Sequence, residues 1–342
     1  MKTVLVTGGS GFIAGWTVVE LLKRGYLVRT TVRSAAKVAL LRTQISDQLR
    51  AQPDGDTRLT FFVADLNNDA GWDDAVAGCD YVIHVAAPVG VDAPRDPEVL
   101  IAPTRNGALR VLRAACQAKV RRVVMTSAIE ACRPAMNSAD GIFDESLWTD
   151  TSDAMLGPYR LAKTLAERAA WDFMSGQSGP TTLTTILPAA VLGPVFSAHY
   201  SHSLNLMQRM LSGSLPRLPQ LGFCVVDVRD VVDLHISAML APEAAGERYI
   251  AASEWMWLAE IAGVLRSNLG NSAQKVPTKA MADFLFRTVA LFNRPMQFVT
   301  PLLGRKHVFT SDKAKRMLDW NPRPAATTIV DSAQCAIALG VV

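Results

Sequence analysis

The stretch Thr3-Val4-Leu5-Val6-Thr7-Gly8-Gly9-Ser10-Gly11-Phe12-Ile13-Ala14 decides the fold. A short β-branched run leads directly into glycines, and an apolar pattern with helical spacing follows before Gly25. This order predicts a strand, a tight turn and a helix. Gly8 permits the sharp turn, Gly11 lets the backbone approach a pyrophosphate, and the small Ala14 lets the helix pack closely on the sheet. The glycines therefore predict a dinucleotide site, against the alternative of a merely structural turn.

The same alternation of strand-like and helical segments recurs along the first half of the chain. The strand-like runs are continuously apolar rather than alternating, which is typical of strands buried on both faces of a parallel sheet. The sequence therefore predicts an α/β fold, with a Rossmann-type, doubly wound parallel sheet. The further strand-like runs lie at Leu27–Val32, Leu59–Val63, Tyr81–Ala86, Val120–Thr126 and Thr182–Leu187.

The regular alternation stops after about Pro188, where the chain becomes richer in proline, methionine and aromatic residues. Residues 1–188 are therefore predicted to form the dinucleotide-binding domain. Residues 189–342 are predicted to form mainly a smaller, mixed α/β domain that caps the substrate site at the carboxyl edge of the sheet. Short strand-like pieces near 224–251 are expected to return to the sheet or to lie beside it.

Composition and charge exclude several classes of protein. Of 342 residues, 49% are apolar and 19% are charged, and the mean hydropathy is +0.17, which excludes a disordered chain or a coiled coil. The net charge of +4 is not concentrated in any basic run, so neither nucleic acid nor a membrane is an expected partner. No apolar stretch reaches about 18 residues, so no membrane span is predicted.

The five cysteines are scattered and never form a CxxC pair, so the sequence indicates neither a disulfide framework nor a zinc site. No metal is predicted, and a reducing cytoplasm is the expected location. The expected partner is a small molecule that carries a carbonyl or alcohol group. The sequence leaves open whether the protein is a monomer or a homodimer.

The end of the second strand indicates which dinucleotide is bound. A site that prefers NAD carries an acid there, but this strand ends Thr30-Thr31-Val32-Arg33, and Lys37 follows. Arg33 and Lys37 favour the 2′-phosphate of NADP, although two solvated surface cations are the alternative. After the third strand, Asp65-Leu66 can meet the adenine, although Asp65 could equally cap a helix.

Tyr159 and Lys163 form the candidate catalytic pair. Gly157-Pro158 precedes them and predicts the start of a helix, so residues four apart lie on one helix face. A nearby ammonium favours the phenolate and is expected to bring the tyrosine pKa down toward neutrality. Such a phenol can give a proton to a carbonyl. A solvated helix face is the alternative, which the dinucleotide turn makes less favourable.

The chain resembles the extended branch of the short-chain dehydrogenase/reductase superfamily, because it combines the Gly8-x2-Gly11 turn with Tyr159-x3-Lys163. More specific motifs resemble the dihydroflavonol and cinnamoyl-CoA reductases and their microbial aldehyde and ketone reductase relatives. These motifs are Thr31-Val32-Arg33, His84-Val85-Ala86-Ala87-Pro88, Lys163-Thr164-Leu165-Ala166-Glu167-Arg168-Ala169-Ala170-Trp171, Ala189-Ala190-Val191-Leu192-Gly193-Pro194, Val226-Asp227-Val228-Arg229-Asp230-Val231 and Leu318-Asp319-Trp320.

This resemblance implies an NADPH-dependent reductase that transfers a hydride to the carbonyl of an aldehyde or ketone. It implies that Tyr159 gives the proton, that Lys163 holds the nicotinamide ribose, and that Pro188 begins a loop against the nicotinamide carboxamide. The predicted NADP(H) site comprises Thr7, Gly8, Gly11, Phe12, Ile13, Arg33, Lys37, Asp65, Leu66, Ala86, Ala87, Pro88, Lys163, Pro188 and Val191.

The chain departs from the family at the carbonyl-orienting serine. The family's fifth strand ends Thr-Ser-Ser, and the second serine orients the substrate carbonyl. Here Thr126-Ser127-Ala128 places an alanine at that position. Ser127 is therefore the candidate catalytic hydroxyl, with Thr126 as the alternative if the backbone shifts by one residue. Loss of a single such donor can slow catalysis by about 10²–10³-fold unless another donor replaces it.

The aromatic and apolar composition of the cap favours an aromatic or bulky apolar substrate. The residues expected to line its pocket, with a role in the core as the alternative, are Trp148, Phe196, Tyr200, Met207 and Phe223. Two other functions stay open. One is another enzyme of the branch, either a nucleotide-sugar epimerase or dehydratase or a hydroxysteroid dehydrogenase. The other is a non-catalytic NADP-binding sensor, which the alanine at position 128 would allow.

Overall fold

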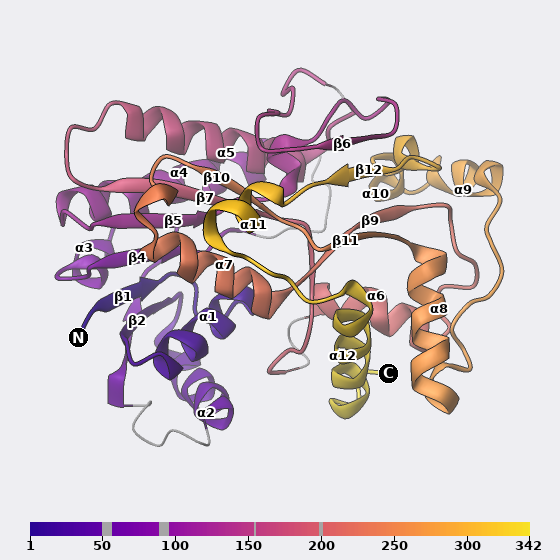
Figure 1. Ribbon diagram of the computed structural model, residues 1–342, viewed down its shortest axis with the longest axis horizontal. Helices are drawn as coiled ribbons and strands as arrows, with labels where there is room; N and C mark the ends of the chain where they lie inside the picture. Colours follow the sequence, from indigo (N-terminus) through magenta and orange to yellow (C-terminus); the bar gives the residue numbers. More distant parts are fainter. Residues whose placement is uncertain (50–56, 89–95, 154, 198–200) are drawn as a thin grey trace.

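A seven-stranded sheet forms the centre of the structure, a computed structural model that describes all residues except 50–56, 89–95, 154 and 198–200 (Figure 1). Every neighbouring pair in the sheet is parallel, in the order β3-β2-β1-β4-β5-β7-β10. The predicted doubly wound parallel sheet is confirmed. Its strands are β1 (Thr3–Val6), β2 (Leu27–Val32), β3 (Leu59–Val63), β4 (Tyr81–His84), β5 (Arg122–Thr126), β7 (Thr182–Pro188) and β10 (Arg248–Ala251).

Helices cover both faces of this sheet, which explains why its strands read as continuous apolar runs. The helices of the first face are α1 (Phe12–Lys23), α2 (Val38–Gln48) and α7 (Val228–Leu240), and those of the second are α3 (Trp72–Val76), α4 (Glu98–Gln117) and α5 (Pro158–Ser175). Successive residues of β1 serve the two cores: Val4 and Val6 pack on the first face, and Leu5 packs on the second.

A second, smaller group of elements lies beyond the carboxyl edge of the sheet, as Figure 1 shows. Its three-stranded sheet joins β8 (Ala190–Leu192), β9 (Gly222–Asp227) and β11 (Glu254–Trp257). Its helices are α6 (Ser201–Leu211), α8 (Leu258–Leu269), α9 (Asp283–Ala290), α10 (Arg294–Gln297) and α12 (Ala325–Ala338), whereas α11 (Asp312–Leu318) packs in the core of the large layer. A two-stranded sheet pairs β6 (Gly141–Phe143) with β12 (His307–Phe309).

The chain crosses between these two groups more than once. Of the two strand-like pieces expected near 224–251, the first becomes β9 in the small sheet, and the second becomes β10 at the edge of the large sheet. The division between residues 188 and 189 stays a prediction, because α7 and β10 follow it and yet pack in the large layer. Over the described ranges, no helix has both the length and the apolar character that crossing a membrane requires.

Candidate active site

The glycine turn after β1 has the tight geometry that its sequence predicts. Gly8 adopts a left-handed backbone with φ +73°, and its N–H donates to Oγ1 of Thr31 at 2.8 Å. A Cβ atom on Gly8 would lie 2.9 Å from Cβ of Ala86. Gly9, to which the sequence analysis gave no role, is equally constrained, because its Cβ would lie 2.2 Å from Oγ1 of Thr30. Glycine is therefore required at both positions.

The N-terminus of α1 follows this turn and suits an anion. Gly11 is the N-cap, so no side chain caps the helix, and the first turn contains no acidic residue. Among the residues that the structure describes, a Cβ atom on Gly11 would meet only the carbonyl oxygen of Gly8, at 3.2 Å. Phe12 and Ile13 open the helix at this end. Backbone amides and the helix dipole at such an end fit the pyrophosphate of a dinucleotide.

Thr7 connects the carboxyl ends of β1 and β4. Its buried hydroxyl accepts from the N–H of Val85 at 3.1 Å and of Ala86 at 3.0 Å, and it lies 2.8 Å from Nδ1 of His84. Burial and the charge of Lys163 lower the pKa of His84 to about 3, so the imidazole is neutral. Thr7 thus holds the segment from Ala86 toward Ala87 and Pro88 beside the glycine turn, and its contact with a cofactor stays a prediction.

Arg33 and Lys37 are both exposed just beyond β2, at the same edge of the sheet. Neither forms a salt bridge with another residue that the structure describes. Ser34 lies between them and accepts from the N–H of Ala36 at 3.3 Å, which turns the chain back past the strand end. This arrangement leaves two cations for a phosphate.

Asp65 makes a local turn rather than a helix cap. Its Oδ1 accepts from the N–H of Asn67 at 2.8 Å, whereas α3 has Gly71 as its N-cap. The helix-cap alternative for Asp65 is therefore wrong. Leu66 packs on α4 at Gly107, because a Cβ atom added to Gly107 would lie 2.8 Å from the Cβ of Leu66.

Pro188 and Val191 lie on either side of the crossing into the small sheet. Pro188 is the buried last residue of β7 and pairs with Ala251 of β10. Val191 is half-buried in β8, where it pairs with Val226. Their contacts with a nicotinamide stay predictions.

Tyr159 and Lys163 stand one turn apart at the start of α5. Pro158 opens the helix after Gly157, whose φ of +78° turns the chain into it. Tyr159 is half-buried in an apolar cluster with Ile101 of α4. Lys163 is buried, and its Nζ donates to the carbonyl oxygen of Thr126 at 3.5 Å. The helix thus brings the pair to the carboxyl end of β5.

The protonation of the pair differs in part from the prediction. Burial, together with the negative charge of Glu130, raises the pKa of Tyr159 above its usual value. The expected lowering of this pKa toward neutrality is wrong for the protein alone, because the phenol packs among apolar side chains. Burial lowers the pKa of Lys163 to about 8, against the opposing charge of Glu167. At neutral pH the phenol keeps its proton and Lys163 keeps its charge.

Glu130 belongs to an ion-pair cluster that the sequence analysis missed. It pairs with Arg133 at 2.9 Å and with Arg160 at 2.6 Å. Although burial opposes them, these two guanidinium groups lower the pKa of Glu130 to about 2. Arg160 also donates to the carbonyl oxygen of Phe298 at 3.1 Å. The residue next to Tyr159 thereby ties α5 to the segment that follows α10.

Ser127 points to a buried carboxylate. Its hydroxyl donates to Oε2 of Glu167 at 2.5 Å, and its side chain is only 4% exposed. The hydroxyl has a single proton, and in this structure it donates that proton in the hydrogen bond to the carboxylate. The role of Ser127 as the donor to a substrate carbonyl stays a prediction, and this hydrogen bond counts against it. Ala128 follows it at the end of the strand and is also buried.

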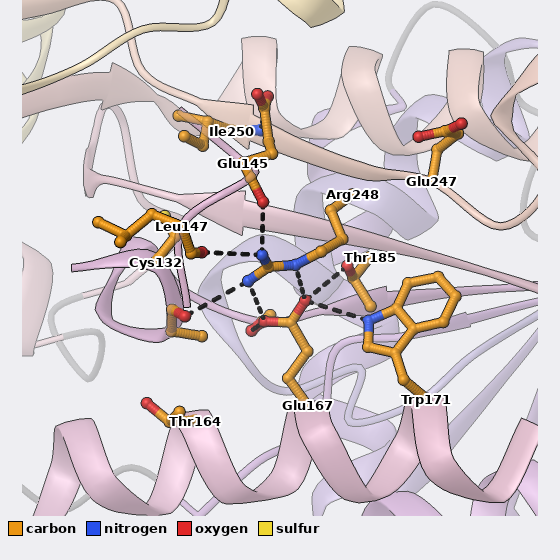
Figure 2. Close-up of polar contacts among 12 residues, drawn as sticks. Cys132, Glu145, Leu147, Thr164, Glu167, Trp171, Thr185, Glu247, Arg248 and Ile250 are labelled. Carbon is orange, nitrogen blue, oxygen red and sulfur yellow. Dashed lines mark hydrogen bonds and ion pairs between the residues drawn. The ribbon is translucent and has the colours of Figure 1, made fainter. Parts of the chain in front are cut away.

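Glu167 is the centre of a buried polar network, shown in Figure 2. Its Oε1 accepts from Thr185 at 2.8 Å, from Trp171 at 3.3 Å and from Nε of Arg248 at 2.8 Å. The Arg248 guanidinium also donates to the carbonyl oxygen of Glu145 at 2.6 Å. The network joins α5 to β7 and β10 one helical turn beyond Lys163.

Most of the aromatic residues expected to line a pocket fill other places. The Arg248 guanidinium lies 3.6 Å from the centre of the Trp148 ring, and Phe196 packs on Trp16 at 4.8 Å between ring centres. Met207 is fully buried in the core of the cap, and Phe223 packs against that core. Tyr200 lies outside the described residues. The four of these residues that the structure describes therefore take part in packing, as in the alternative that gave them a role in the core.

The NAD dependent epimerase/dehydratase family matches residues 4–252, well over half of the chain. The chain belongs to this family. The resemblance to the extended short-chain dehydrogenases/reductases is thereby confirmed, and the protein is an oxidoreductase of this group. The family's dependence on a nicotinamide dinucleotide agrees with the glycine turn and the uncapped end of α1.

Two reductases of Arabidopsis thaliana are relatives of this family member. Cinnamoyl-CoA reductase 1 is 37% identical over 267 residues, which cover 77% of this chain and 74% of the relative. Dihydroflavonol 4-reductase is 36% identical over 277 residues, covering 78% of this chain and 69% of the relative. The crystal structure of yeast methylglyoxal/isovaleraldehyde reductase Gre2 complexed with NADPH has the same fold. It has a TM-score of 0.81 and 24% identity, and covers 99% of this chain and all of Gre2.

Proposed function

We propose that the protein is an NADPH-dependent reductase of an aldehyde or ketone with an aromatic or bulky apolar group. The observation that carries the proposal is the placement of Tyr159 and Lys163 one turn apart, with Lys163 against the carboxyl end of β5. When bound, NADPH supplies the hydride that the carbonyl carbon accepts. The reaction is reversible, so the same residues can serve alcohol oxidation.

Two residues of this chain supply the proton and stabilise the group that loses it. As the carbonyl carbon gains the hydride, the O–H bond of Tyr159 breaks and a new O–H bond forms on the carbonyl oxygen, which yields an alcohol. The raised pKa of Tyr159 keeps this proton in place at neutral pH. The charged Lys163 holds the ribose and stabilises the phenolate that the transfer leaves.

Arg33 and Lys37 support NADPH rather than NADH. Both are exposed beyond β2, where an acid would otherwise meet the ribose hydroxyl. A guanidinium can donate two hydrogen bonds to one phosphate, and an ammonium adds a point charge. The substrate class rests on the named relatives, which are reductases of cinnamoyl-CoA and of dihydroflavonols.

A turnover assay tests the reaction. Purified protein is expected to oxidise NADPH with a panel of aryl aldehydes and ketones, and Tyr159→Phe is expected to lower turnover by at least about 10²-fold. Tyr26→Phe is the matched control, because this half-buried phenol follows Gly25 at the far end of the sheet. Full turnover in Tyr159→Phe would contradict the mechanism. Turnover of a nucleotide sugar with no aldehyde reduction would favour the epimerase alternative.

Cofactor binding tests the two cations. Arg33→Ala is expected to weaken NADPH binding by about tenfold or more and to leave NADH binding unchanged, because only NADPH carries the 2′-phosphate. Arg121→Ala, an exposed arginine remote from the strand end, is the control. Equal losses for the two cofactors would show that Arg33 does not recognise the phosphate.

A further inference from the structure

An exposed apolar surface on the cap has no role in the proposed reaction. It spans α9 and the turn after it, and we call it the 284–292 patch. Phe292 is 90% exposed, Phe284 is 74% exposed and Leu291 is 71% exposed. The other members of the patch are Leu285 and Val289, which are also exposed. Large apolar side chains gathered in this way mark an interaction surface.

The surface faces outward because only a narrow face of α9 is buried. Phe286 and Ala290, one turn apart, are buried against Leu303 and anchor α9 to the cap. Phe284 and Leu291 are seven residues apart and so share the opposite side of the helix. Arg287 lies between them in sequence, one turn from each, and is exposed. Arg287 thus lies on the same exposed face as Phe284 and Leu291, and a combination of apolar side chains and a cation fits a helix that lies in a membrane interface.

The segment that carries the patch is strongly positive. Residues 275–306 contain six cations and one acid, a net charge of +5, whereas the whole chain carries only +4. All six cations are exposed, and the single acid, Asp283, is half-buried. The cations are Lys275, Lys279, Arg287, Arg294, Arg305 and Lys306. A membrane partner was not expected from the sequence, because these cations are dispersed rather than gathered in a run. In the folded chain, the exposed Arg287 lies within the patch and the exposed Arg294 directly follows it.

We propose that the 284–292 patch binds the surface of an anionic lipid bilayer. Phenylalanine and leucine side chains enter the interface between headgroups and acyl chains, and the exposed Arg287 and Arg294 meet the lipid charges. The charge argues against a second copy of this chain as the occupant, because a symmetric contact would bring identical cations together. No segment of the chain spans the membrane in this proposal.

The segment after α10, which follows the patch in the chain, contacts the start of α5. The Phe298 carbonyl after α10 accepts from Arg160, and a Cβ atom on Gly157 would lie 3.2 Å from the Phe298 ring. α9 and α10 share one apolar cluster through Phe286 and Met296, at the outer part of the cap in Figure 1.

Sedimentation of the full chain with lipid vesicles tests the proposal. Vesicles that contain about 30% phosphatidylserine are expected to bind the protein at least about tenfold more strongly than pure phosphatidylcholine vesicles. Raising the salt from about 0.1 M to about 0.5 M is expected to remove most of this preference, because salt screens the charges. Equal binding to both vesicles, or binding to neither, would overturn the proposal.

Variants connect the binding to the patch. Phe284→Ser with Phe292→Ser is expected to weaken vesicle binding by about tenfold or more and to leave the melting temperature and any aldehyde turnover unchanged. Leu40→Ser with Leu240→Ser is the matched control, since these exposed leucines lie on α2 and α7.

A charge variant completes the test. Arg287→Gln with Arg294→Gln is expected to reduce the preference for anionic vesicles, whereas Arg121→Gln with Arg316→Gln is not, because both control arginines are exposed away from the patch. The proposal would be overturned if the parent protein self-associates but does not bind vesicles, and if the phenylalanine variant no longer self-associates. This result would identify the patch as a dimer contact. The vesicle readout does not depend on turnover, so it stands or fails separately from the proposed reaction.

Discussion

Lys163 carries a charge that titrates within the range of ordinary buffers. Its pKa is lowered to about 8, so NADPH affinity is expected to fall as the pH rises through about 8 and the ammonium loses its proton. Tyr159 does not titrate in this range, because its own pKa is raised. Lys163→Arg is expected to remove this pH dependence, since a guanidinium stays charged. NADPH fluorescence between pH 6 and pH 10 measures it, and the same pH dependence in the arginine variant would assign it to another group.

Ser127 and Ala128 form a second test at the level of single residues. Ala128→Ser is expected to raise kcat by at least about tenfold, because it restores a hydroxyl where a carbonyl donor is expected. Ser127→Ala is expected to leave kcat nearly unchanged and to lower the free energy of unfolding by about 1–3 kcal/mol, because Glu167 loses a charge-assisted hydrogen bond. Urea unfolding and turnover separate the two effects. A large loss of kcat in Ser127→Ala would make Ser127 the donor.

The residues that support the site were harder to predict than the residues that form it. Tyr159, Lys163 and the glycines stand in short local patterns, and these patterns taken together were enough to predict their roles. Glu167 and Arg248 form a buried ion pair across 81 positions of sequence, and no local pattern connects them. Charged residues are rarely buried unless they are paired, so each alone indicates a solvated side chain. The pKa of Tyr159 was mispredicted for the same reason, because its apolar neighbour Ile101 comes from another helix.

The position of Tyr159 depends on how α5 begins. Gly157 has a φ of +78°, and the Phe298 ring lies 3.2 Å from where its Cβ would be. Gly157→Ala is expected to cost about 1–2 kcal/mol of stability from the backbone alone and to lower kcat by displacing Tyr159. Gly78→Ala is the matched control, because Gly78 has a φ of +70° and no atom of the described residues lies within 4 Å of where its Cβ would be. Equal kcat values for the two variants would show that the backbone conformation at the start of α5 does not affect turnover.

The strands were the most predictable elements. Parallel strands covered on both faces are continuously apolar, so the sequence indicated their positions to within about two residues. The structure ends β4 at His84 rather than at Ala86 and begins β5 at Arg122 rather than at Val120. The cap was less predictable, because its short strands and helices depend on contacts between distant segments. β9 and β10 illustrate this, since similar apolar runs entered different sheets.

At the scale of the whole molecule, the large sheet is complete only with residues beyond its predicted boundary. Without them, β7 would become an open edge, and the face that α7 covers would be exposed. The fragment 1–188 is therefore expected to aggregate and to bind a hydrophobic dye, whereas the full chain does not. Size-exclusion chromatography and dye fluorescence measure this. A monomeric fragment with cooperative unfolding would show that the first 188 residues form a self-sufficient domain.

The placement of the cysteines has a chemical consequence for an enzyme of this kind. Cys79, Cys132 and Cys224 are free and buried, and burial raises the pKa of each thiol, to about 11 for Cys79 and Cys224. Thiolates, rather than thiols, attack electrophiles, and these three sulfur atoms are kept protonated and out of reach. An enzyme that handles reactive aldehydes would in this way be protected at these positions from covalent damage by its own substrate.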